Sequence, residues 1–442
     1  MANINRGLSS SQIIILGFAA LILLGSLLLM LPFATQSGQG ASFFDALFTS
    51  TSAVCVTGLV IHDTATYWST FGHIIIITLI QIGGMGIVTV AVAVFVLSGK
   101  RIGLKQRSTM QEAISAHKVG GIVRLTGFIV RTALLIELIG ALIMAPSFIK
   151  EFGTLKGIWY ALFHSVSAFC NAGFDLMGVK SPFSSVTYFA GNPFINFTII
   201  ALIVVGGIGF MTWEDIKTNK LRIREYRMQS KVILSTTLAL ILLPAIYFYF
   251  LEFSDMPLNE RIWSSLFQSV TPRTAGFNVV DLTKISEVGS AITILLMLIG
   301  GSPGSTAGGM KTTTLAVMLS TMVSVFQRRE HTHFFGRRVN EDTIRSAATV
   351  LMMYITLFLT GGLIISRVEG LPLLSCLYET ASAIGTVGLS LGITPGLGII
   401  SKIILILLMY IGRVGGLTLI FSTLSASRGN TSRLPQEKIT VG

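Results

Sequence analysis

The sequence predicts an all-α membrane protein in which eight transmembrane helices and four re-entrant loops surround one pseudo-fourfold axis. The composition indicates the membrane class, because 52% of the 442 residues are apolar and only 12% are charged, about half the charged fraction of a soluble protein. Apolar segments long enough to cross a bilayer recur along the chain. The fourfold arrangement follows from two short motifs that each occur four times in the same order.

The composition and the charge pattern exclude several other classes of protein. The formal net charge is +12, but Lys and Arg stand in short blocks between apolar segments, a pattern that reports membrane topology. A nucleic-acid partner would need a basic patch or a recognition fold, so we expect none. Cys55, Cys170 and Cys376 have neither metal-site nor disulfide spacing, and no metalloenzyme motif such as HExxH occurs. We therefore expect no enzyme activity and no covalent cofactor.

The first repeated motif leads from an aromatic residue through a Ser/Thr-rich stretch to a glycine. Its glycines are Gly58, Gly173, Gly276 and Gly388, and the third copy is one residue shorter before its glycine. A second, glycine-containing motif follows each copy. The copies of the first motif are LFTSTSAVCVTGL (47–59), LFHSVSAFCNAGF (162–174), LFQSVTPRTAGF (266–277) and LYETASAIGTVGL (377–389), and those of the second are IGGMGIVT (82–89), VGGIGFMT (205–212), IGGSPGST (299–306) and IGRVGGLT (411–418).

Each predicted repeat has a first apolar span (M1), a shorter amphipathic segment that ends at the first motif (P), and a second apolar span (M2). The short segments, such as 41–55 and 371–384, cannot cross a bilayer and return as helices. We expect each to form a half-helix followed by an extended pore loop, which is tolerated only where protein or water surrounds the backbone. The predicted repeats are 1–99, 100–217, 218–327 and 328–442, the last with a cytoplasmic tail; the first spans are about 11–33, 123–149, 231–251 and 344–366, and the second spans about 72–98, 194–213, 287–326 and 398–424.

The basic residues predict the orientation of the chain. Most Lys and Arg residues fall in the segments that follow the second spans. By the positive-inside rule, both termini and these segments lie in the cytoplasm, and the four pore loops lie at the outer face. The first apolar run has no small-residue cleavage pattern, so we expect an uncleaved span and not a signal peptide. The basic segments are 100–124, 217–231, 328–345 and 428–438.

Four pore loops in one chain can line a central pathway for a cation. Each half-helix would direct the partial negative charge of its C-terminal end toward that pathway. Glycine tolerates best the backbone angles that turn a row of carbonyls to one side, and rings of carbonyls replace the hydration shell of potassium in selective pores. The predicted ion selectivity filter, with K⁺ as the bound and transported ion, therefore comprises Val56, Thr57, Gly58, Asn171, Ala172, Gly173, Thr274, Ala275, Gly276, Thr386, Val387 and Gly388.

Three features of the predicted filter leave alternatives open. Glycines in membrane helices also serve close helix packing, and the four filter copies differ from one another, since Thr386-Val387-Gly388 alone matches the potassium-channel core. Asp63, Asp175 and Asp281 follow three of the glycines and are either loop charges or a means of concentrating cations at the outer mouth. Arg273 adjoins a filter strand, and we expect its side chain to point away, toward a carboxylate or solvent.

The second span of the third repeat is interrupted by GGSPGSTAGGMKTTT (300–314), the gate loop. Gly, Ser and Pro cannot sustain a regular helix there, so we expect an intramembrane loop that obstructs the pore below the filter. A simple kink is the alternative, and a phosphate-binding loop is disfavoured because Met310 disrupts the GK[ST] spacing and no strand precedes it. The predicted gate residues are Gly300, Gly301, Ser302, Gly304, Ser305, Thr306, Gly308, Gly309 and Lys311, together with Arg413.

Arg413 stands where the other repeats have the second glycine of the second motif. An ionisable residue inside a span is a functional candidate, and we expect it to donate hydrogen bonds to carbonyls of the gate loop and to raise the barrier to cations. A structural ion pair with a buried acid such as Glu379 is the alternative.

These features together resemble the Trk/Ktr/HKT superfamily of potassium transporters over essentially the whole chain. With eight predicted spans, the chain looks most like the Ktr membrane subunits (KtrB). The resemblance implies potassium uptake across a bacterial plasma membrane, with Na⁺ as a coupling or activating ion. It also implies a homodimer with one pore per protomer, gated by a cytosolic ring of nucleotide-binding RCK subunits (KtrA-like) that docks on the basic loops, including 328–338, and on the tail 428–442.

A second class of function is an ion-coupled secondary transporter of an organic solute. Such transporters also use broken helices, but usually in two inverted repeats with carboxylates at the membrane midplane. The four repeats predicted here run parallel, because each begins on the cytoplasmic side, and this favours the potassium pathway.

Overall fold

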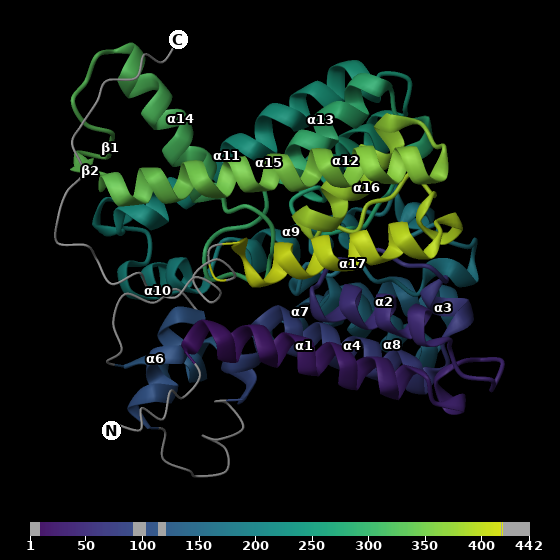
Figure 1. The fold of residues 1–442 in the computed structure, drawn as a ribbon. Coiled ribbons are helices and arrows are strands. Elements are labelled where there is room, and N and C mark those ends of the chain that lie inside the picture. The colour runs from purple at the N-terminus through teal and green to yellow at the C-terminus, as the bar shows by residue number, and fades with distance from the viewer. Residues whose placement is uncertain (1–8, 92–102, 114–120, 417, 419–442) are drawn as a thin grey trace.

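The computed structural model describes residues 9–91, 103–113, 121–416 and 418, and it is almost entirely helical (Figure 1). The predicted docking tail 428–442 and the N-terminal residues before Ser9 lie outside the described residues. The helices of eight or more residues are α1 (Ser10–Leu29), α2 (Phe43–Val54), α4 (Thr70–Met85), α6 (Leu104–Ala113), α7 (Ile122–Phe152), α8 (Thr154–Phe169), α9 (Pro193–Gly207), α10 (Phe210–Asn219), α11 (Met228–Tyr247), α12 (Leu258–Val270), α13 (Glu287–Leu298), α14 (Thr312–Phe326), α15 (Glu341–Glu369), α16 (Leu373–Gly385) and α17 (Ile399–Val414); α3 (Thr64–Tyr67) is a single turn.

The four predicted first spans are confirmed as helices. The helices α1, α7, α11 with its π-helical continuation to Glu252, and α15 are long and apolar enough to cross a membrane. A capping box starts α1, since Ser9 Oγ accepts from the amide of Gln12 and the Gln12 side chain accepts from the amide of Ser9. Glycines with positive φ, Gly153 and Gly370, end α7 and α15, and Gly370 has the left-handed conformation that commonly ends a helix.

The second spans predicted for the first, second and fourth repeats are not continuous helices, and this part of the prediction is wrong. Within the described residues, α4, α9 and α17 stop at the second motif, where Gly86, Gly209 and Gly415 have φ of +85°, +91° and +88°. A helix cannot pass through such a residue. The axes of α9 and α10 differ by 96° across this break, and parts of the spans predicted at 72–98 and 398–424 lie outside the described residues.

The first glycine of the second motif explains why the motif recurs. It packs against the carbonyl that closes a pore helix, so closely that a Cβ would collide with the oxygen. The second-span helix can therefore approach the C-terminal end of the pore helix directly. The pairs are Gly83 with Val54, Gly206 with Phe169 and Gly412 with Ile384; the third-repeat counterpart, Gly300, contacts Gly308 of the gate loop instead.

Hydroxyl groups fasten three pore helices to their first spans. In each case a buried Ser or Thr of the pore helix donates to a main-chain carbonyl of the long helix, in addition to the regular helical bonds, and a glycine three residues later in the long helix makes room for it. The pairs are Ser50 with the Ile22 carbonyl (2.7 Å), Ser165 with that of Glu137 (2.6 Å) and Thr380 with that of Phe358 (3.2 Å).

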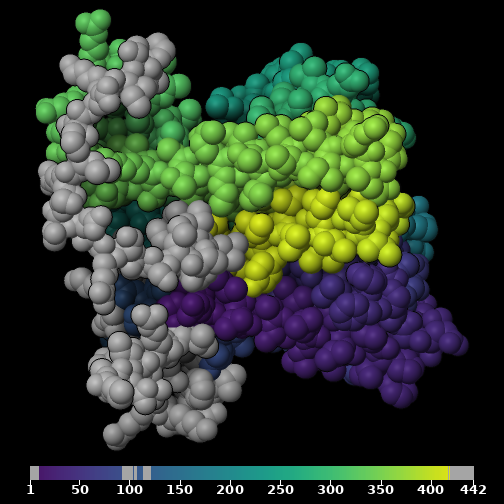
Figure 2. All heavy atoms as spheres, in the orientation of Figure 1, coloured from purple at the N-terminus to yellow at the C-terminus, as the bar shows by residue number. Residues whose placement is uncertain are grey.

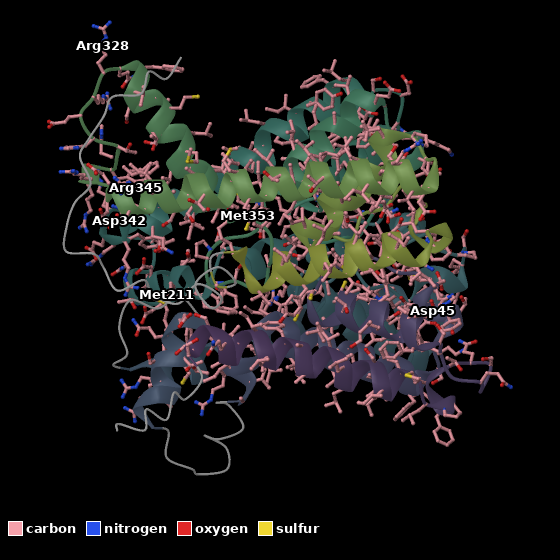
Figure 3. The ribbon with its side chains drawn as sticks, viewed as in Figure 1. Asp45, Met211, Arg328, Asp342, Arg345 and Met353 are labelled. Atoms are coloured by element: carbon pink, nitrogen blue, oxygen red, sulfur yellow. The ribbon has the colours of Figure 1, made fainter. Side chains whose placement is uncertain are left out.

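The long helices α1, α15 and α17 run side by side along one direction (Figure 1). In Figure 2 the surfaces of α15, α17 and α1 form adjacent bands across the molecule. The described chain begins and ends at the same end of the bundle, because Tyr410 of α17 donates a hydrogen bond of 2.7 Å to the Ile15 carbonyl of α1. Arg328, Asp342 and Arg345 lie at this end, and Asp45 lies at the other (Figure 3).

A short hairpin forms the only β-sheet among the described residues. The strands β1 (His333–Phe334) and β2 (Arg337–Arg338) pair antiparallel in the basic loop after α14. Phe335 and Gly336 both have positive φ (48° and 76°), as a two-residue type I′ turn requires. The sequence signal was weak, because Phe is an unusual first residue for such a turn.

We predict that Gly140→Leu lowers the thermal stability of the protein in detergent. A Cβ at Gly140 would lie 2.5 Å from Ser165 Oγ and 2.8 Å from Leu202 Cδ1, so the side chain would force the pore helix off α7, at a cost of about 1–3 kcal/mol. Gly127→Leu in the same helix is the matched control, because nothing lies within 4 Å of its Cβ position. Circular dichroism melts measure both variants; equal losses would contradict the packing role.

Candidate functional site

Four helices end at the predicted filter. The pore helices α2, α8, α12 and α16 stop at Val54, Phe169, Val270 and Gly385, directly before the filter residues. Their C-terminal dipole ends therefore face the strands that follow, which favours a cation there. We call these the filter strands, and they comprise Val56–Gly58, Asn171–Gly173, Thr274–Gly276 and Thr386–Gly388.

The filter strands share one unusual backbone conformation. In each strand the first and third residues have positive φ and the middle residue does not. This alternation turns successive peptide groups to the same side, and at a residue with a side chain it costs about 1–2 kcal/mol. The positive φ values are 57° at Val56, 59° at Asn171, 68° at Thr274 and 51° at Thr386, and 91°, 69°, 78° and 94° at the glycines Gly58, Gly173, Gly276 and Gly388.

The structure brings the four glycines together in a closed ring. A Cβ placed on each glycine would lie against the Cα of the glycine in the next strand, and the carbonyl oxygen of the residue before that glycine is also a neighbour. No side chain fits between strands that approach so closely. The distances are 3.1 Å from Gly58 to Gly173, 2.8 Å from Gly173 to Gly276, 3.4 Å from Gly276 to Gly388 and 2.9 Å from Gly388 to Gly58, and the carbonyls are those of Ala172, Ala275, Val387 and Thr57.

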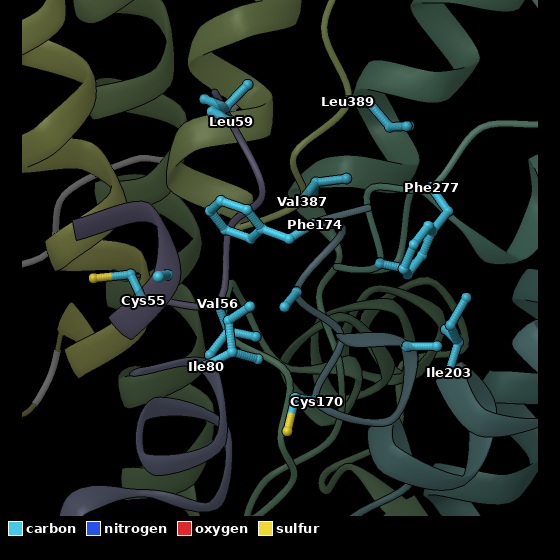
Figure 4. Packing of buried hydrophobic residues seen from close by; sticks show 14 of the residues in the cluster. Cys55, Val56, Leu59, Ile80, Cys170, Phe174, Ile203, Phe277, Val387 and Leu389 are labelled. Atoms are coloured by element: carbon cyan, nitrogen blue, oxygen red, sulfur yellow. The ribbon is translucent and has the colours of Figure 1, made fainter. Parts of the chain in front are cut away.

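Side chains of the pore helices hold the strands in place. Ser52 and Ser382 accept hydrogen bonds of 3.0 Å from the amides of Gly58 and Gly388. In the second repeat the equivalent Ser167 donates instead to the Phe174 carbonyl, at 2.7 Å. Figure 4 shows the apolar residues around the strands, among them Val56, Phe174, Phe277 and Val387, packed between the surrounding helices.

Two adjacent strands are also joined directly. The side-chain amide group of Asn171 and the hydroxyl of Thr274 are hydrogen-bonded at 3.1 Å. By contrast, the hydroxyls of Thr57 and Thr386 are buried without a hydrogen-bond partner among the described residues. A buried unpaired oxygen acceptor needs a ligand such as a cation or water, and two of them stand in the filter strands.

A cavity of about 460 Å³ opens outside the glycine ring. All four filter glycines line it, and so do Asp63, Asp175 and Asp281. Two of these carboxylates also have local roles. Asp63 caps α3 and accepts a hydrogen bond of 2.9 Å from the Phe183 amide, and Asp281 forms an ion pair with Lys284 at 3.4 Å. The three carboxyl groups nevertheless share the lining of this cavity.

Asp175 lies in the loop between α8 and α9, outside the predicted spans. Burial is the main cause that raises the pKa of Asp175 to about 7, with a smaller contribution from the charge of Asp63, against a hydrogen bond of 2.8 Å from the Met177 amide. A carboxyl group with a raised pKa is neutral below that pH and charged above it. The negative charge of the cavity mouth therefore increases as the pH rises through about 7.

Arg273 does not reach a carboxylate or solvent, so that expectation is wrong. Its side chain is only 4% exposed and points to α11, where a guanidinium nitrogen lies 3.4 Å from Thr237 Oγ1. The third copy of the first motif is one residue shorter, Arg273 comes three residues after Val270, the last residue of α12, and its side chain faces the first span. It does point away from the glycine ring, as expected.

The gate loop is confirmed as non-helical from Ile299 to Lys311, although Thr312–Thr314 begin α14. Its amides bond to carbonyls at the broken ends of the second spans in the second and fourth repeats. Such carbonyls have no helical partner because their helices stop there. The bonds run from Ser302 to Gly207 (2.9 Å), from Thr306 to Gly206 (3.2 Å) and from Gly309 to Gly412 (3.1 Å), and the Thr306 hydroxyl bonds to the Phe169 carbonyl (3.1 Å).

Bonds within the gate loop fix its shape. The ends of the loop are closed by Gly300, whose amide donates to the Met310 carbonyl at 2.7 Å, and by Gly301, which accepts from the Thr312 amide at 3.1 Å. Lys311 folds back so that its ammonium group lies 2.9 Å from the Ala307 carbonyl. Other bonds within the loop join Ser305 Oγ to the Ser302 carbonyl (2.7 Å), Lys311 Nζ to the Gly308 carbonyl (3.3 Å) and the hydroxyls of Ser302 and Thr312 (3.1 Å), and the Phe210 amide of α10 donates to the Gly304 carbonyl (2.7 Å).

The gate loop lies directly beneath the filter. A Cβ on Gly308 would lie 3.0 Å from Thr386 Cγ2, and one on Gly309 would lie 2.8 Å from the Gly385 carbonyl. A second cavity of about 320 Å³, on the far side of the loop, is lined by Gly304, Ser305 and Lys311 among others. The filter strands and the gate loop together separate this inner cavity from the outer one.

Arg413 joins the gate loop to the first repeat. Its guanidinium group donates to the Thr306 carbonyl of the loop and to the carbonyls of Gly83 and Gly84, the last at 2.9 Å. The alternative partner, Glu379, accepts from Ser390 and Thr394 and holds the loop that follows the fourth filter strand.

Sequence reasoning missed three sets of residues at this site. The carbonyls of Gly83 and Gly84 accept from Arg413, and the third glycines of the second motif end the second-span helices. Both stand inside the repeated motif, so their recurrence was a usable signal. The hydroxyls of Ser52, Ser167 and Ser382 were visible as a Ser six residues before each glycine in three copies.

Comparisons with known proteins agree on one family. Residues 8–427 match the family model of TrkH, described as a cation transport protein. The chain is 40% identical to the potassium/sodium uptake protein NtpJ of Enterococcus hirae over 450 residues, which cover 99% of this chain and 98% of that one. It is 38% identical over 437 residues to the Ktr system potassium uptake protein B of Bacillus subtilis, with 98% and 96% covered.

A solved structure has the same fold. The crystal structure of the potassium transporter TrkH from Vibrio parahaemolyticus matches with a TM-score of 0.75 and covers 96% of this chain and 87% of that chain. The identity is 20%, so this likeness shows the fold alone.

We predict that a carboxyl group at the outer cavity titrates near neutral pH. Because the pKa of Asp175 is about 7, the band of a protonated carboxyl in infrared difference spectra should disappear between about pH 6 and about pH 8. Asp175→Asn should lack this band. Asp281→Asn should keep it, since hydrogen bonds from Thr283 lower the pKa of Asp281. An unchanged band in Asp175→Asn would show that another group titrates.

Proposed function

The chain belongs to the TrkH family of cation transport proteins, and on this premise we propose that it takes up potassium as the membrane subunit of a Ktr-type system. The family is one of transporters and not of enzymes. Two of its relatives, at 40% and 38% identity over nearly their whole length, are named for potassium/sodium uptake and for Ktr potassium uptake. The organic-solute alternative has no comparable support.

The proposed selectivity filter consists of the four filter strands. One observation carries it, namely the closed ring of Gly58, Gly173, Gly276 and Gly388, in which each glycine adjoins the carbonyl before the next. Carbonyl oxygens of Thr57, Ala172, Ala275 and Val387 would replace water around K⁺. The pore-helix ends and the acidic outer cavity would supply negative potential along the approach.

The proposed gate is the gate loop held by Arg413. The loop lies between the filter and the inner cavity, and its amides and Arg413 use carbonyls that the broken second spans leave free. Opening would require the loop to leave these partners. A guanidinium group beside the pathway would also repel a cation until it moves.

The topology and assembly of the chain follow from the same premise. We propose four parallel M1–P–M2 repeats with the boundaries predicted above, eight membrane crossings with four re-entrant loops, and both termini on the cytoplasmic side of a bacterial plasma membrane. The basic hairpin region 328–338 would face the cytoplasm and, with the tail, dock a ring of RCK subunits on a homodimer. Na⁺ would act as a coupling or activating ion, in line with the name of the E. hirae relative.

We predict that Ser at any one of the four filter glycines reduces potassium uptake at least tenfold. A side chain at φ between +69° and +94° is strained, by about 1–2 kcal/mol, and it would enter the space of the neighbouring strand. The measurement is rubidium uptake in a strain deficient in potassium transport, with the partner subunit co-expressed.

Gly396→Ser is the matched control for the filter variants. This outer-loop glycine has nothing within 4 Å of its Cβ position and no positive φ, so its uptake should equal that of the wild type. Normal uptake by Gly276→Ser or Gly173→Ser in well-folded protein would exclude the proposed filter.

We predict that Arg413→Ala increases cation flux several-fold in proteoliposomes without the cytosolic partner. The substitution removes three charge-assisted hydrogen bonds to main-chain carbonyls, each worth about 1.5–3 kcal/mol, and a positive charge beside the pathway. Lys402→Ala, which removes a cation from the other end of α17, should leave the flux unchanged. An unaltered flux in folded Arg413→Ala protein would refute the gating role.

A further inference from the structure

A basic cavity lies between α6, α7 and α10, at the end of the molecule away from α3 and the outer cavity (Figure 1). Its volume is about 710 Å³. Four cationic side chains, Arg107, Arg124, Arg131 and Lys217, line it, and no acidic residue lines it within the described part of the chain. Four like charges that converge on one hollow repel one another, so the cavity has the chemistry of an anion site.

Three of the cations gather at one face of α7, and one of them contacts the ring of Phe128. Arg124, Phe128 and Arg131 follow one another at helical spacing and share a face of α7. Lys217 extends from α10 to this face, with its Nζ 4.1 Å from the centre of the Phe128 ring. The cation–π contact holds the ammonium group at the face of α7 that carries the two arginines. Among the described residues, Arg124, Arg131 and Lys217 form none of the ion pairs.

The same face of α7 continues as an exposed apolar stripe. Leu135, Leu138 and Leu142 are 56%, 53% and 64% exposed, and they follow Arg131 at spacings of four, three and four residues. A cationic cluster at one end of such a stripe matches an amphiphile that has an anionic head and apolar chains. A soluble acidic protein would use the charges but would leave the stripe without a partner.

We propose that this cavity binds the head group of an anionic glycerophospholipid, with the acyl chains along the Leu135–Leu142 face. Arginine suits a phosphodiester because its planar fork donates two parallel hydrogen bonds to phosphate oxygens. The amides at the start of α7, which Gly121 leaves without a side-chain cap, add partial positive charge beside the same cavity. The site is separate from the proposed filter and does not depend on the transported ion.

The test is lipid binding to the purified full-length chain, followed by native mass spectrometry. Phosphatidylglycerol is titrated in parallel with neutral phosphatidylcholine. The cavity variant Arg124→Gln/Arg131→Gln should bind phosphatidylglycerol about thirtyfold more weakly than the wild type, since each of the two cations at a lipid surface contributes about 1 kcal/mol. The control Arg328→Gln/Arg345→Gln removes two cations at the same end of the molecule (Figure 3) and should bind like the wild type.

Two further measurements decide the identity of the ligand. Lys217→Gln should weaken phosphatidylglycerol binding by itself. If a thermal melt shows that the double variant is not folded, this single variant tests the site in its place. Inorganic phosphate should not displace phosphatidylglycerol at matched concentration. The lipid site would be overturned if the cavity variant and the control bound phosphatidylglycerol equally, or if the two lipids bound equally. Displacement of phosphatidylglycerol by inorganic phosphate or by soluble polyglutamate would also overturn it.

Discussion

The close approach of four main chains at the glycine ring is the constraint on which the rest of the structure depends. Main-chain carbonyls can replace the water around a cation only if their strands meet with no side chain between them. Gly58, Gly173, Gly276 and Gly388 satisfy this condition, with hypothetical Cβ positions 2.8–3.4 Å from the next glycine. The residue two positions before each glycine has a strained backbone conformation. The surrounding pore helices and strands must hold it there, because a left-handed conformation at Val56 or Asn171 is not stable by itself.

That surrounding support has a further consequence for the inner side of the molecule. Three of the four pore helices are fixed by a hydroxyl bond to the first span and by a glycine contact to the second span. Because three second-span helices stop at a positive-φ glycine, carbonyls such as those of Gly83, Gly206 and Gly412 lose their helical partners. The gate loop and Arg413 use these carbonyls. The same breaks that allow tight packing around the filter therefore create the polar attachment points of the proposed gate.

Much of this arrangement was predictable from the sequence, because the repeated motifs record contacts that occur four times. The family resemblance is confirmed, and so are the first spans and the irregular gate loop. The second spans of the first, second and fourth repeats were predicted as continuous helices because hydropathy is insensitive to backbone angle, and only a positive φ at Gly86, Gly209 and Gly415 ends them. The direction of Arg273 depends on a one-residue shortening whose rotational effect needs coordinates. The basic cavity joins α7 and α10, and no local pattern reports that contact.

The most direct test of the carbonyl ring is a structure of the full-length protein determined in thallium or rubidium, with anomalous scattering to locate the ion. A peak on the axis enclosed by the carbonyls of Thr57, Ala172, Ala275 and Val387 is the expected result. Bound ions found only elsewhere in the molecule, for instance beside the buried Glu137, with none between the four strands, would contradict the proposed filter.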